Sequence, residues 1–258
     1  MQSPLLPDPL IHFEQLQKSF GQRRIFDDLT LDIREGETLT VIGGSGTGKS
    51  VLLKCLIGLM QPDAGRIRFE GEDITDFTEG QFLPVRKKVA MVFQGSALFD
   101  SFTVGENVAY PLRVQFPEMD EDALNTRVAE SLALVNLPGT ESMRPADLSG
   151  GMRKRVGLAR AIASEPKVIL WDEPTTGLDP ISTRVIDELI NSMKRTLGCT
   201  SIVVTHDMQS AFAVSDRIAL LAHRRIVQVG TVEQMRQSQQ ADVRAFLDAR
   251  GPQGGAAR

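Results

Sequence analysis

Apolar residues form short uninterrupted runs in some parts of the chain and alternating or helical patterns in others. Uninterrupted runs of β-branched and aliphatic residues are typical of buried parallel strands, and they occur at 38–42, 89–93, 168–171 and 201–205. Alternation of apolar and polar residues predicts strands at 11–16, 25–33 and 66–70, and a hairpin of 218–221 with 226–229. Helices are predicted at 51–60, 152–163, 185–197 and 243–247.

The pattern changes between residues 103 and 164, where the periods are helical. Leu124, Val128, Leu132 and Val135 fall on one face of a helix that Asp120 could cap. Strand signals resume only at residue 168. The chain is therefore predicted to have an α/β fold that carries a helical insert.

The stretch between the first uninterrupted strand and its helix has the spacing G-x-x-x-x-G-K-S of the phosphate-binding P-loop. Its glycines let the backbone curl, so that its amides and the positive end of the following helix face a phosphate. The lysine can reach the β- and γ-phosphates, and the serine hydroxyl can bind Mg²⁺. A glycine-rich turn that binds nothing is the alternative, which the flanking strand and helix disfavour. The loop consists of Gly43, Gly44, Ser45, Gly46, Thr47, Gly48, Lys49 and Ser50.

A pair of acids follows the predicted strand at 168–171. A carboxylate at the tip of a buried strand beside the P-loop can hold the hydration shell of Mg²⁺, which suits Asp172. Glu173 would then face the attacking water as general base, a role that contributes about 10²–10⁴ in rate. The alternative is an ordinary Asp-Glu pair at a helix start, but the preceding strand and Pro174 disfavour it.

A second possible anion site precedes the helix at 152–163 and consists of Ser149, Gly150 and Gly151. Taken alone, an ordinary serine cap with a tight turn would explain these residues. Two anion sites and one nucleotide per chain, however, favour a head-to-tail dimer. Each ATP would then be held between the P-loop of one chain and Ser149–Gly151 of the other.

The order of these motifs resembles that of the ATPase subunits of ABC transporters, and the resemblance covers nearly the whole chain. The motifs that carry it are Gly43–Ser50, Gln94, Leu148–Met152, Leu170–Glu173, Gly177–Asp179 and His206. The resemblance implies that ATP and Mg²⁺ bind, that Gln94 contacts Mg²⁺ and senses a permease, and that His206 reaches the γ-phosphate. It also implies that Asp179 links the two sites across the dimer.

The same resemblance completes the expected site. Phe20 stands where this family stacks an aromatic ring on adenine, and Val51 follows the P-loop serine in the nucleotide-binding set. The expected catalytic residues are Lys49, Glu173 and His206, and the expected Mg²⁺ ligands are Ser50, Gln94 and Asp172. Without the other motifs, Phe20 would be interpreted as a core residue and His206 as an ordinary residue at the end of a strand.

The resemblance implies a P-loop (RecA-like) ATPase core of the α/β class with an antiparallel β subdomain and an inserted helical subdomain. We expect a single domain over 11–247 and a C-terminal tail over 248–258. The core would occupy about 11–93 and 165–247, and the helical subdomain about 95–164. Met152 departs from the family, which has glutamine after Ser-Gly-Gly. Trp171 is interpreted as packing.

The composition of the chain limits the classes of binding partner and the cellular location that we expect. The formal net charge is −4 over 258 residues, with acids and bases mixed along the chain, which argues against nucleic acid as the main partner. Cys55 and Cys199 are expected as reduced thiols in the core. Residues 1–8 lack the basic start of a signal peptide, and no apolar run approaches the roughly twenty residues that span a bilayer. We therefore expect a cytoplasmic polypeptide that serves a membrane by docking on another protein.

Further stretches resemble the Mla/Mce-type lipid transport ATPases of double-membraned bacteria, at 46–54, 98–113, 149–152 and 243–248. The resemblance implies phospholipid transport, a membrane-embedded permease, an Mce-domain lipid-binding protein and, as a further candidate, a small regulatory subunit. It places the chain at the cytoplasmic face of the inner membrane. Leu98, Phe99 and Phe102 would form the permease dock, unless they are core residues.

Two other functions keep the same ATP site. One is an ABC ATPase subunit for a small polar solute, which lipid-stimulated ATPase activity would separate from the first. The other is a soluble ABC ATPase acting in cofactor assembly or on nucleic acid, which co-purification with a membrane protein would exclude. The net negative charge and the lack of a long coiled-coil insertion disfavour a function in which the protein acts on DNA. The kinase alternative is disfavoured because it would leave the motif Leu148–Met152 unexplained.

Overall fold

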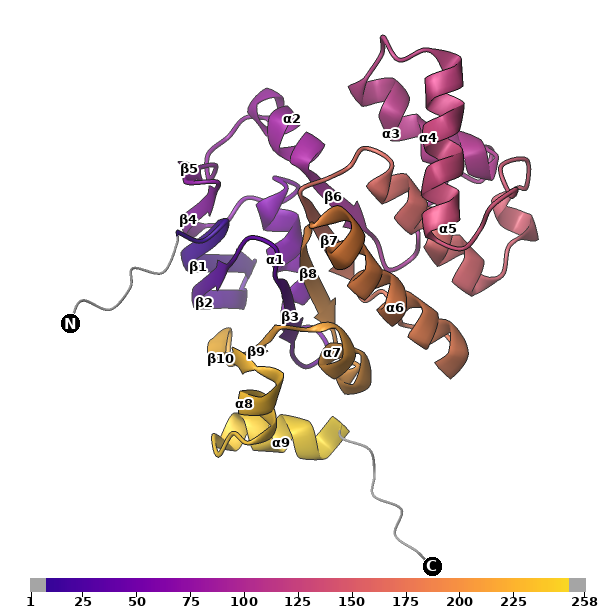
Figure 1. Cartoon of the computed structure of the whole chain (residues 1–258). Helices are drawn as coiled ribbons and strands as arrows, with labels where there is room; N and C mark the ends of the chain where they lie inside the picture. Colours follow the sequence, from indigo (N-terminus) through magenta and orange to yellow (C-terminus); the bar gives the residue numbers. More distant parts are fainter. Residues whose placement is uncertain (1–7, 251–258) are drawn as a thin grey trace, which may run out of the picture.

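A six-stranded sheet forms the centre of the computed structural model, which describes residues 8–250 (Figure 1). Its strands, in spatial order, are β10 (Arg225–Thr231), β9 (Arg217–Ala222), β3 (Thr38–Ile42), β8 (Thr200–Thr205), β7 (Val168–Asp172) and β6 (Val89–Val92). Strands β9 to β6 are parallel, and β10 pairs antiparallel with β9 as the predicted hairpin. The uninterrupted apolar runs are thus the neighbouring strands β3, β8, β7 and β6, because strands covered on both faces need no polar side.

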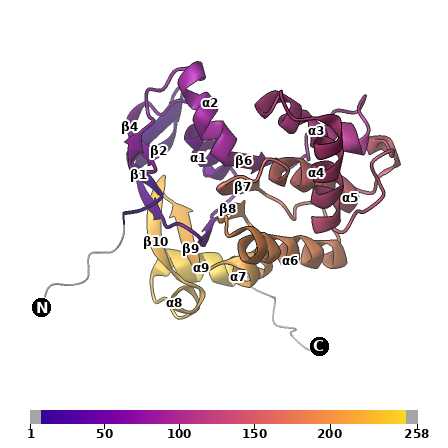
Figure 2. The same cartoon turned by 45° about the horizontal axis from the view of Figure 1, so that its top comes forward.

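The alternating segments form a separate antiparallel sheet in the order β2-β1-β4-β5. Its strands are β1 (Ile11–Phe20), β2 (Arg23–Ile33), β4 (Ala64–Phe69) and β5 (Glu72–Asp73). Both views show this sheet on one side of the parallel sheet and the helices of the insert on the other (Figures 1 and 2). The antiparallel β subdomain expected from the family resemblance is present.

The helical insert contains α3 (Val104–Gln115), α4 (Glu121–Leu134) and α5 (Gly150–Ile162). Asp120 caps α4 as predicted, because its side chain accepts a hydrogen bond from Ala123 N at 2.8 Å. The four apolar residues assigned to one face of this helix are all buried. These helices lie within the segment 95–164 that the sequence assigns to a helical subdomain.

The sequence prediction was wrong for two helices, the end of α1 (Lys49–Leu56) and the existence of α2 (Glu79–Lys88). α1 ends before residue 60, because Gly58 adopts a φ of +68°. α2 was not predicted, since it contains Pro84 and buries only Phe82 and Val85. Its start is nevertheless marked by a capping box, in which Thr78 N donates to Gln81 Oε1 at 2.9 Å.

The C-terminal half adds α6 (Pro180–Leu197), α7 (Met208–Val214), α8 (Val232–Arg236) and α9 (Ala241–Arg250). The long amphipathic helix begins at Pro180 rather than 185, because Asp179 caps it and proline suits the first helical position. Residues 248–250 are helical, so the predicted tail was placed too early. Residues 251–258 lie outside the described range, as do residues 1–7.

Side chains of the parallel sheet alternate between two interiors. Val168 and Leu170 pack with α1 and the antiparallel sheet, whereas Ile169 and Trp171 pack with the helices of the insert and α6. Trp171 is 1 % exposed, which confirms its packing role. Both cysteines are free and buried, and burial raises the pKa of each thiol to about 11.

Candidate active site

The parallel register brings the ends of three strands to one edge of the sheet. Ile42 of β3 pairs with Thr205 of β8, and Asp172 of β7 pairs with Val204 of β8. The P-loop, the acidic pair and His206 follow these strand ends directly. Ligands of open parallel sheets bind at such carboxyl ends, so residues about 160 positions apart in sequence share one site.

The P-loop adopts a conformation that requires glycine at two positions. Gly46 and Gly48 have φ of +74° and +104°, a region that residues with a β-carbon avoid. A β-carbon on Gly48 would also lie 2.3 Å from Ile25 Cγ2. Thr47 Oγ1 donates to Gly44 O at 3.0 Å and holds the turn. The loop is thus a tight backbone cradle at the start of α1, which suits a phosphate group.

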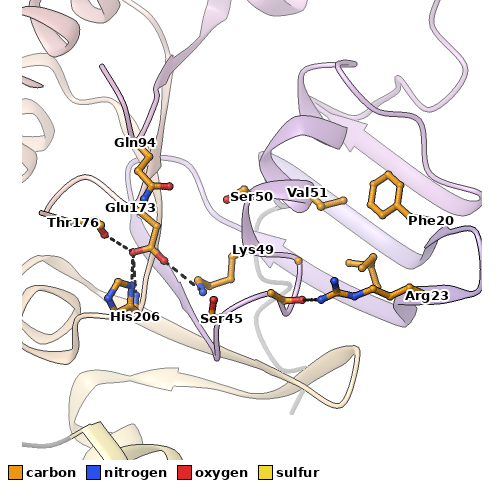
Figure 3. A pocket seen from close by; sticks show the side chains of 13 residues that line it. Phe20, Arg23, Ser45, Lys49, Ser50, Val51, Gln94, Glu173, Thr176 and His206 are labelled. Atoms are coloured by element: carbon orange, nitrogen blue, oxygen red, sulfur yellow. Dashed lines mark hydrogen bonds and ion pairs between the residues drawn. The ribbon is translucent and has the colours of Figure 1, made fainter. Parts of the chain in front are cut away.

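Lys49, Glu173 and His206 meet beside the loop (Figure 3). Lys49 Nζ lies 3.5 Å from Glu173 Oε1 and donates to Gly43 O and Gly44 O at 3.0 and 3.1 Å. His206 Nδ1 lies 2.8 Å from Glu173 Oε2. Lys49 and Glu173 are only 7 % and 9 % exposed, so each desolvated charge compensates the other.

Glu173 is held by its backbone as well as by its partners. Its φ is +49°, which is uncommon for a residue with a side chain and occurs often at functional positions. Its amide donates to Val204 O at 2.9 Å, and Thr176 Oγ1 donates to its carboxylate at 3.1 Å. The strand end therefore turns and aims the carboxylate into the pocket.

Two of the three predicted metal ligands are in direct contact. Ser50 Oγ donates to Asp172 Oδ1 at 2.6 Å, which joins the first turn of α1 to the end of β7. Gln94, two residues beyond β6, lines the same pocket. A hydroxyl, a carboxylate and an amide are hard oxygen donors of the kind that Mg²⁺ prefers, so this set fits that ion.

One open pocket of about 650 Å³ is lined by Lys49, Glu173 and His206 together with Ser50 and Gln94. Phe20, at the end of β1, lines the pocket at the opposite end from Glu173 and His206 (Figure 3). Its ring is 47 % exposed and free of the core, so it presents a face on which a planar base could stack. Ser45, Gly46, Gly48, Ser50 and Val51 line the stretch of pocket that includes Lys49.

Arg23, Ile25 and Thr176 also line the pocket, although no sequence motif singled them out. Arg23 pairs with Phe20 across the turn between β1 and β2. Its Nη2 donates to Gly46 O at 3.1 Å. The available signal was its position three residues after Phe20, which a hairpin turn brings to the same end of the sheet.

Ser149, Gly150, Gly151 and Asp179 do not line this pocket. The Ser149 hydroxyl accepts from Met152 N at 3.2 Å and caps α5. Asp179 accepts from two amides in the first turn of α6, and the Ser182 hydroxyl beside it lowers the pKa of its carboxyl. Within one chain Ser149 and Asp179 act as helix caps, and Gly150 and Gly151 form the first turn of α5.

Met152 packs against the hydrophobic core of the insert. Met152 is partly buried, and its apolar side chain adds to this cluster. The departure from the family pattern thus has a packing explanation.

The chain matches the family model for ABC transporters over residues 26–176. It is 42 % identical over 95 % of its length to a probable ribonucleotide transport ATP-binding protein, mkl, of Mycobacterium leprae, covering 71 % of that protein. It is 40 % identical over 92 % of its length to the intermembrane phospholipid transport ATP-binding protein MlaF of Haemophilus influenzae, covering 90 % of it. For MlaF of Escherichia coli K12 the identity is 38 %, over 94 % of this chain and 91 % of that protein.

Solved structures give the same result. The ATP-binding cassette MJ0796, a dimer in a post-hydrolysis state with ADP and phosphate, superposes with a TM-score of 0.79 at 29 % identity, over 86 % of this chain and 98 % of that one. The cbiO1 subunit of the Clostridium perfringens transporter cbiONQ superposes with a TM-score of 0.82 at 28 % identity. The superposition covers 95 % of this chain and 96 % of that one. Family model, relatives and fold agree, and this chain is an ATPase of the ABC transporter family.

Proposed function

We propose that ATP binds with its adenine on Phe20 and its phosphates in the P-loop. The linear order of the pocket supports this orientation, because an exposed ring lies at one end and the Lys49–Glu173 pair at the other. Lys49 Nζ would exchange its present oxygen partners for the β- and γ-phosphates. Ser50, Asp172 and Gln94 would hold Mg²⁺, which neutralises phosphate charge when bound.

Glu173 is the proposed general base. Its carboxylate accepts a proton from the attacking water as the water oxygen bonds to the γ-phosphorus, and the bond from that phosphorus to the β-phosphate oxygen breaks. ADP and phosphate result. His206, already 2.8 Å from the carboxylate, would orient it and contact the γ-phosphate. Nearly complete burial of Glu173 keeps competing water away from the base.

The working unit is proposed to be a head-to-tail dimer closed by ATP. The exposed Ser149–Gly151 corner lies outside its own pocket, so it is available to a second chain. In the dimer it would contact the γ-phosphate held by its partner, with Asp179 between the two sites. Loss of that phosphate on hydrolysis would open the pair, and a permease would read the two states as a rigid-body change.

We propose that the permease docks in a groove of about 360 Å³ between α2, β6, α3 and α5. Phe99 and Tyr110 line it with ring centroids 4.9 Å apart, and Arg160 lies over Phe99. Of the three residues predicted to form the dock, Phe99 lines this groove, whereas Leu98 packs against the interior cluster and Phe102 lines a neighbouring groove. The dock is therefore shifted toward Tyr110.

The cargo is proposed to be phospholipid, moved between bacterial membranes. Support comes from the MlaF relatives, at 38–40 % identity over at least nine-tenths of both chains. None of the helices in residues 8–250 has the length and apolarity to span a bilayer. We infer a peripheral position at the cytoplasmic face of the inner membrane, through the permease. An Mce-domain lipid-binding protein and a small regulatory subunit complete the proposed assembly.

A second cargo is favoured by the mkl relative, at 42 % identity, whose name assigns it to ribonucleotide transport. The discriminating experiment reconstitutes the ATPase with its co-purifying membrane protein in nanodiscs and measures ATP hydrolysis. Phospholipid transport predicts that the rate of ATP hydrolysis changes with the lipid headgroup. It should not change with added ribonucleoside monophosphates, which have no phosphoanhydride bond for the ATPase to cleave. The reverse dependence would establish the second cargo.

The ATP site itself is tested by two variants. Lys49→Ala should lose hydrolysis, because the cation that contacts the phosphates is gone. Glu173→Gln should keep ATP binding and lower turnover by at least about 10² through loss of the base. Near-normal turnover of Glu173→Gln would show that another group takes the proton.

A further inference from the structure

We propose that Arg23 is a nucleotide-binding residue that contacts the phosphate nearest the ribose and so sets affinity for ATP and ADP alike. The inference rests on the placement of nucleotide in the pocket proposed above. It adds a cation from the antiparallel sheet to a phosphate site otherwise built by the P-loop and the parallel sheet.

The position of Arg23 follows from the register of its hairpin and from one hydrogen bond of its guanidinium. Phe20 and Arg23 are register partners across the turn between β1 and β2, so both side chains belong to one rigid hairpin. Arg23 Nη2 donates to Gly46 O at 3.1 Å, and a β-carbon on Gly46 would lie 2.9 Å from that nitrogen. Figure 3 shows the side chain reaching from β2 toward the loop, between the ring and Lys49.

The charge of Arg23 has a different environment from that of the other pocket cations. Lys49 is paired with Glu173, whereas no carboxylate in residues 8–250 forms an ion pair with Arg23. The adjacent Arg24 is instead paired with Asp27 at 2.9 Å and does not line the pocket. A guanidinium has five donors, and the bond to Gly46 O uses one of them. The pocket therefore holds an uncompensated cation with donors to spare, which suits a phosphate.

The order of Phe20, Arg23 and Lys49 along the pocket determines which phosphate Arg23 would contact. With adenine on Phe20 and the terminal phosphates at Lys49, the segment between them is the ribose and its attached phosphate. Figure 3 shows Arg23 between Phe20 and Lys49, where this segment would lie. Because ADP and ATP share it, the contact should contribute to both nucleotides by the same factor.

The test compares Arg23→Gln with Arg24→Gln by calorimetric titration with ADP and with ATP in the presence of Mg²⁺, in the Glu173→Gln background to prevent turnover. Loss of a charge-assisted hydrogen bond at a partly solvated site should weaken both nucleotides about tenfold for Arg23→Gln. Arg24→Gln should bind as the parent does. Arg23→Lys should recover part of the affinity, because it restores the charge without the fork.

Ionic strength separates a phosphate contact from a purely structural clamp on the P-loop. If the charge acts on phosphate, affinity for ADP should fall with added NaCl in the parent and less steeply in Arg23→Gln. Equal affinities of the two glutamine variants, an unchanged salt dependence, or a loss confined to ATP would each overturn the proposal. If Lys49→Ala leaves ADP binding intact, the pocket assignment itself is wrong, which is a distinct result.

Discussion

Glu173 and Asp187 are both buried carboxylates, but Glu173 lines the pocket with Lys49 beside it, whereas Asp187 lies between α6 and α7. Asp187, on α6, is 9 % exposed. Its Oδ2 accepts from Ser210 Oγ at 3.1 Å, while its Oδ1 is buried without a hydrogen-bond partner. Burial, together with the nearby charge of Asp207, raises the pKa of Asp187 to about 6. This residue serves the contact between α6 and α7 at a cost to stability.

The cost depends on pH, because the pKa of Asp187 differs between the folded and unfolded states. The folded state holds the Asp187 proton up to about pH 6, whereas the unfolded chain releases it near 3.8. Stability from this group is therefore present at low pH and is lost as pH rises through this interval. Asp187→Asn should raise Tm by roughly 2–4 °C at pH 8 and by much less at pH 4.5.

Calorimetry at the two pH values measures the effect. The matched control is Glu188→Gln, which removes one negative charge from the exposed position next along the same helix. An equal gain in Tm for both variants, or a gain for Asp187→Asn that does not depend on pH, would contradict the assignment.

At the scale of elements, the contact between α1 and α2 shows why the first helix is short. Gly58 ends α1, and a β-carbon there would lie 2.4 Å from the ring of Phe82 on α2. Arg86 Nε, also on α2, donates to Ile57 O at 2.9 Å. The Gly58 backbone thus lies against the Phe82 ring with no room for a β-carbon, so tertiary packing overrides the apolar pattern.

Gly58→Ala should lower the free energy of unfolding by about 2–4 kcal/mol, since it adds overpacking against Phe82 to the strain of a positive φ. Gly36→Ala is the control, because Gly36 has a φ of +74° but no atom within 4 Å of a β-carbon. It should cost about 1–2 kcal/mol from strain alone. Urea unfolding measures both, and equal losses would show that Phe82 moves aside freely.

At the scale of the whole molecule, the site is proposed to be complete only in a dimer, and Gly150 offers a clean test. A β-carbon at Gly150 meets nothing within 4 Å, and an acidic residue suits the first turn of α5. Gly150→Glu should therefore fold, yet its carboxylate would face the terminal phosphate held by the partner.

In the Glu173→Gln background with ATP and Mg²⁺, light scattering after gel filtration should show dimers for the parent and monomers for Gly150→Glu. Binding of ADP to each monomer should be unchanged. Gly80→Glu, which is equally open in the first turn of α2, is the control and should dimerise. Dimers of Gly150→Glu as abundant as those of the parent would place the corner away from the nucleotide.

The sequence by itself determined the strands of the central sheet, the helical insert and the family. Uninterrupted apolar runs report burial on both faces, and helical periods report a single buried face, whatever the neighbours are. The P-loop spacing is likewise local, because it encodes positive φ at Gly46 and Gly48. Glu173 was expected beside the P-loop because it follows the tip of a buried strand, whereas His206 was added to the site only by the family resemblance.

The tertiary structure alone decided distances between remote segments. The register of β3, β7 and β8 brings Lys49, Glu173 and His206 into contact, and a hairpin brings Arg23 to the P-loop. Neither register nor packing can be read from a local pattern, since both depend on which segments meet. The end of α1 likewise depends on packing, since a β-carbon on Gly58 would lie 2.4 Å from the ring of Phe82 on α2. Helix α2 was missed because it contains Pro84 and buries only Phe82 and Val85.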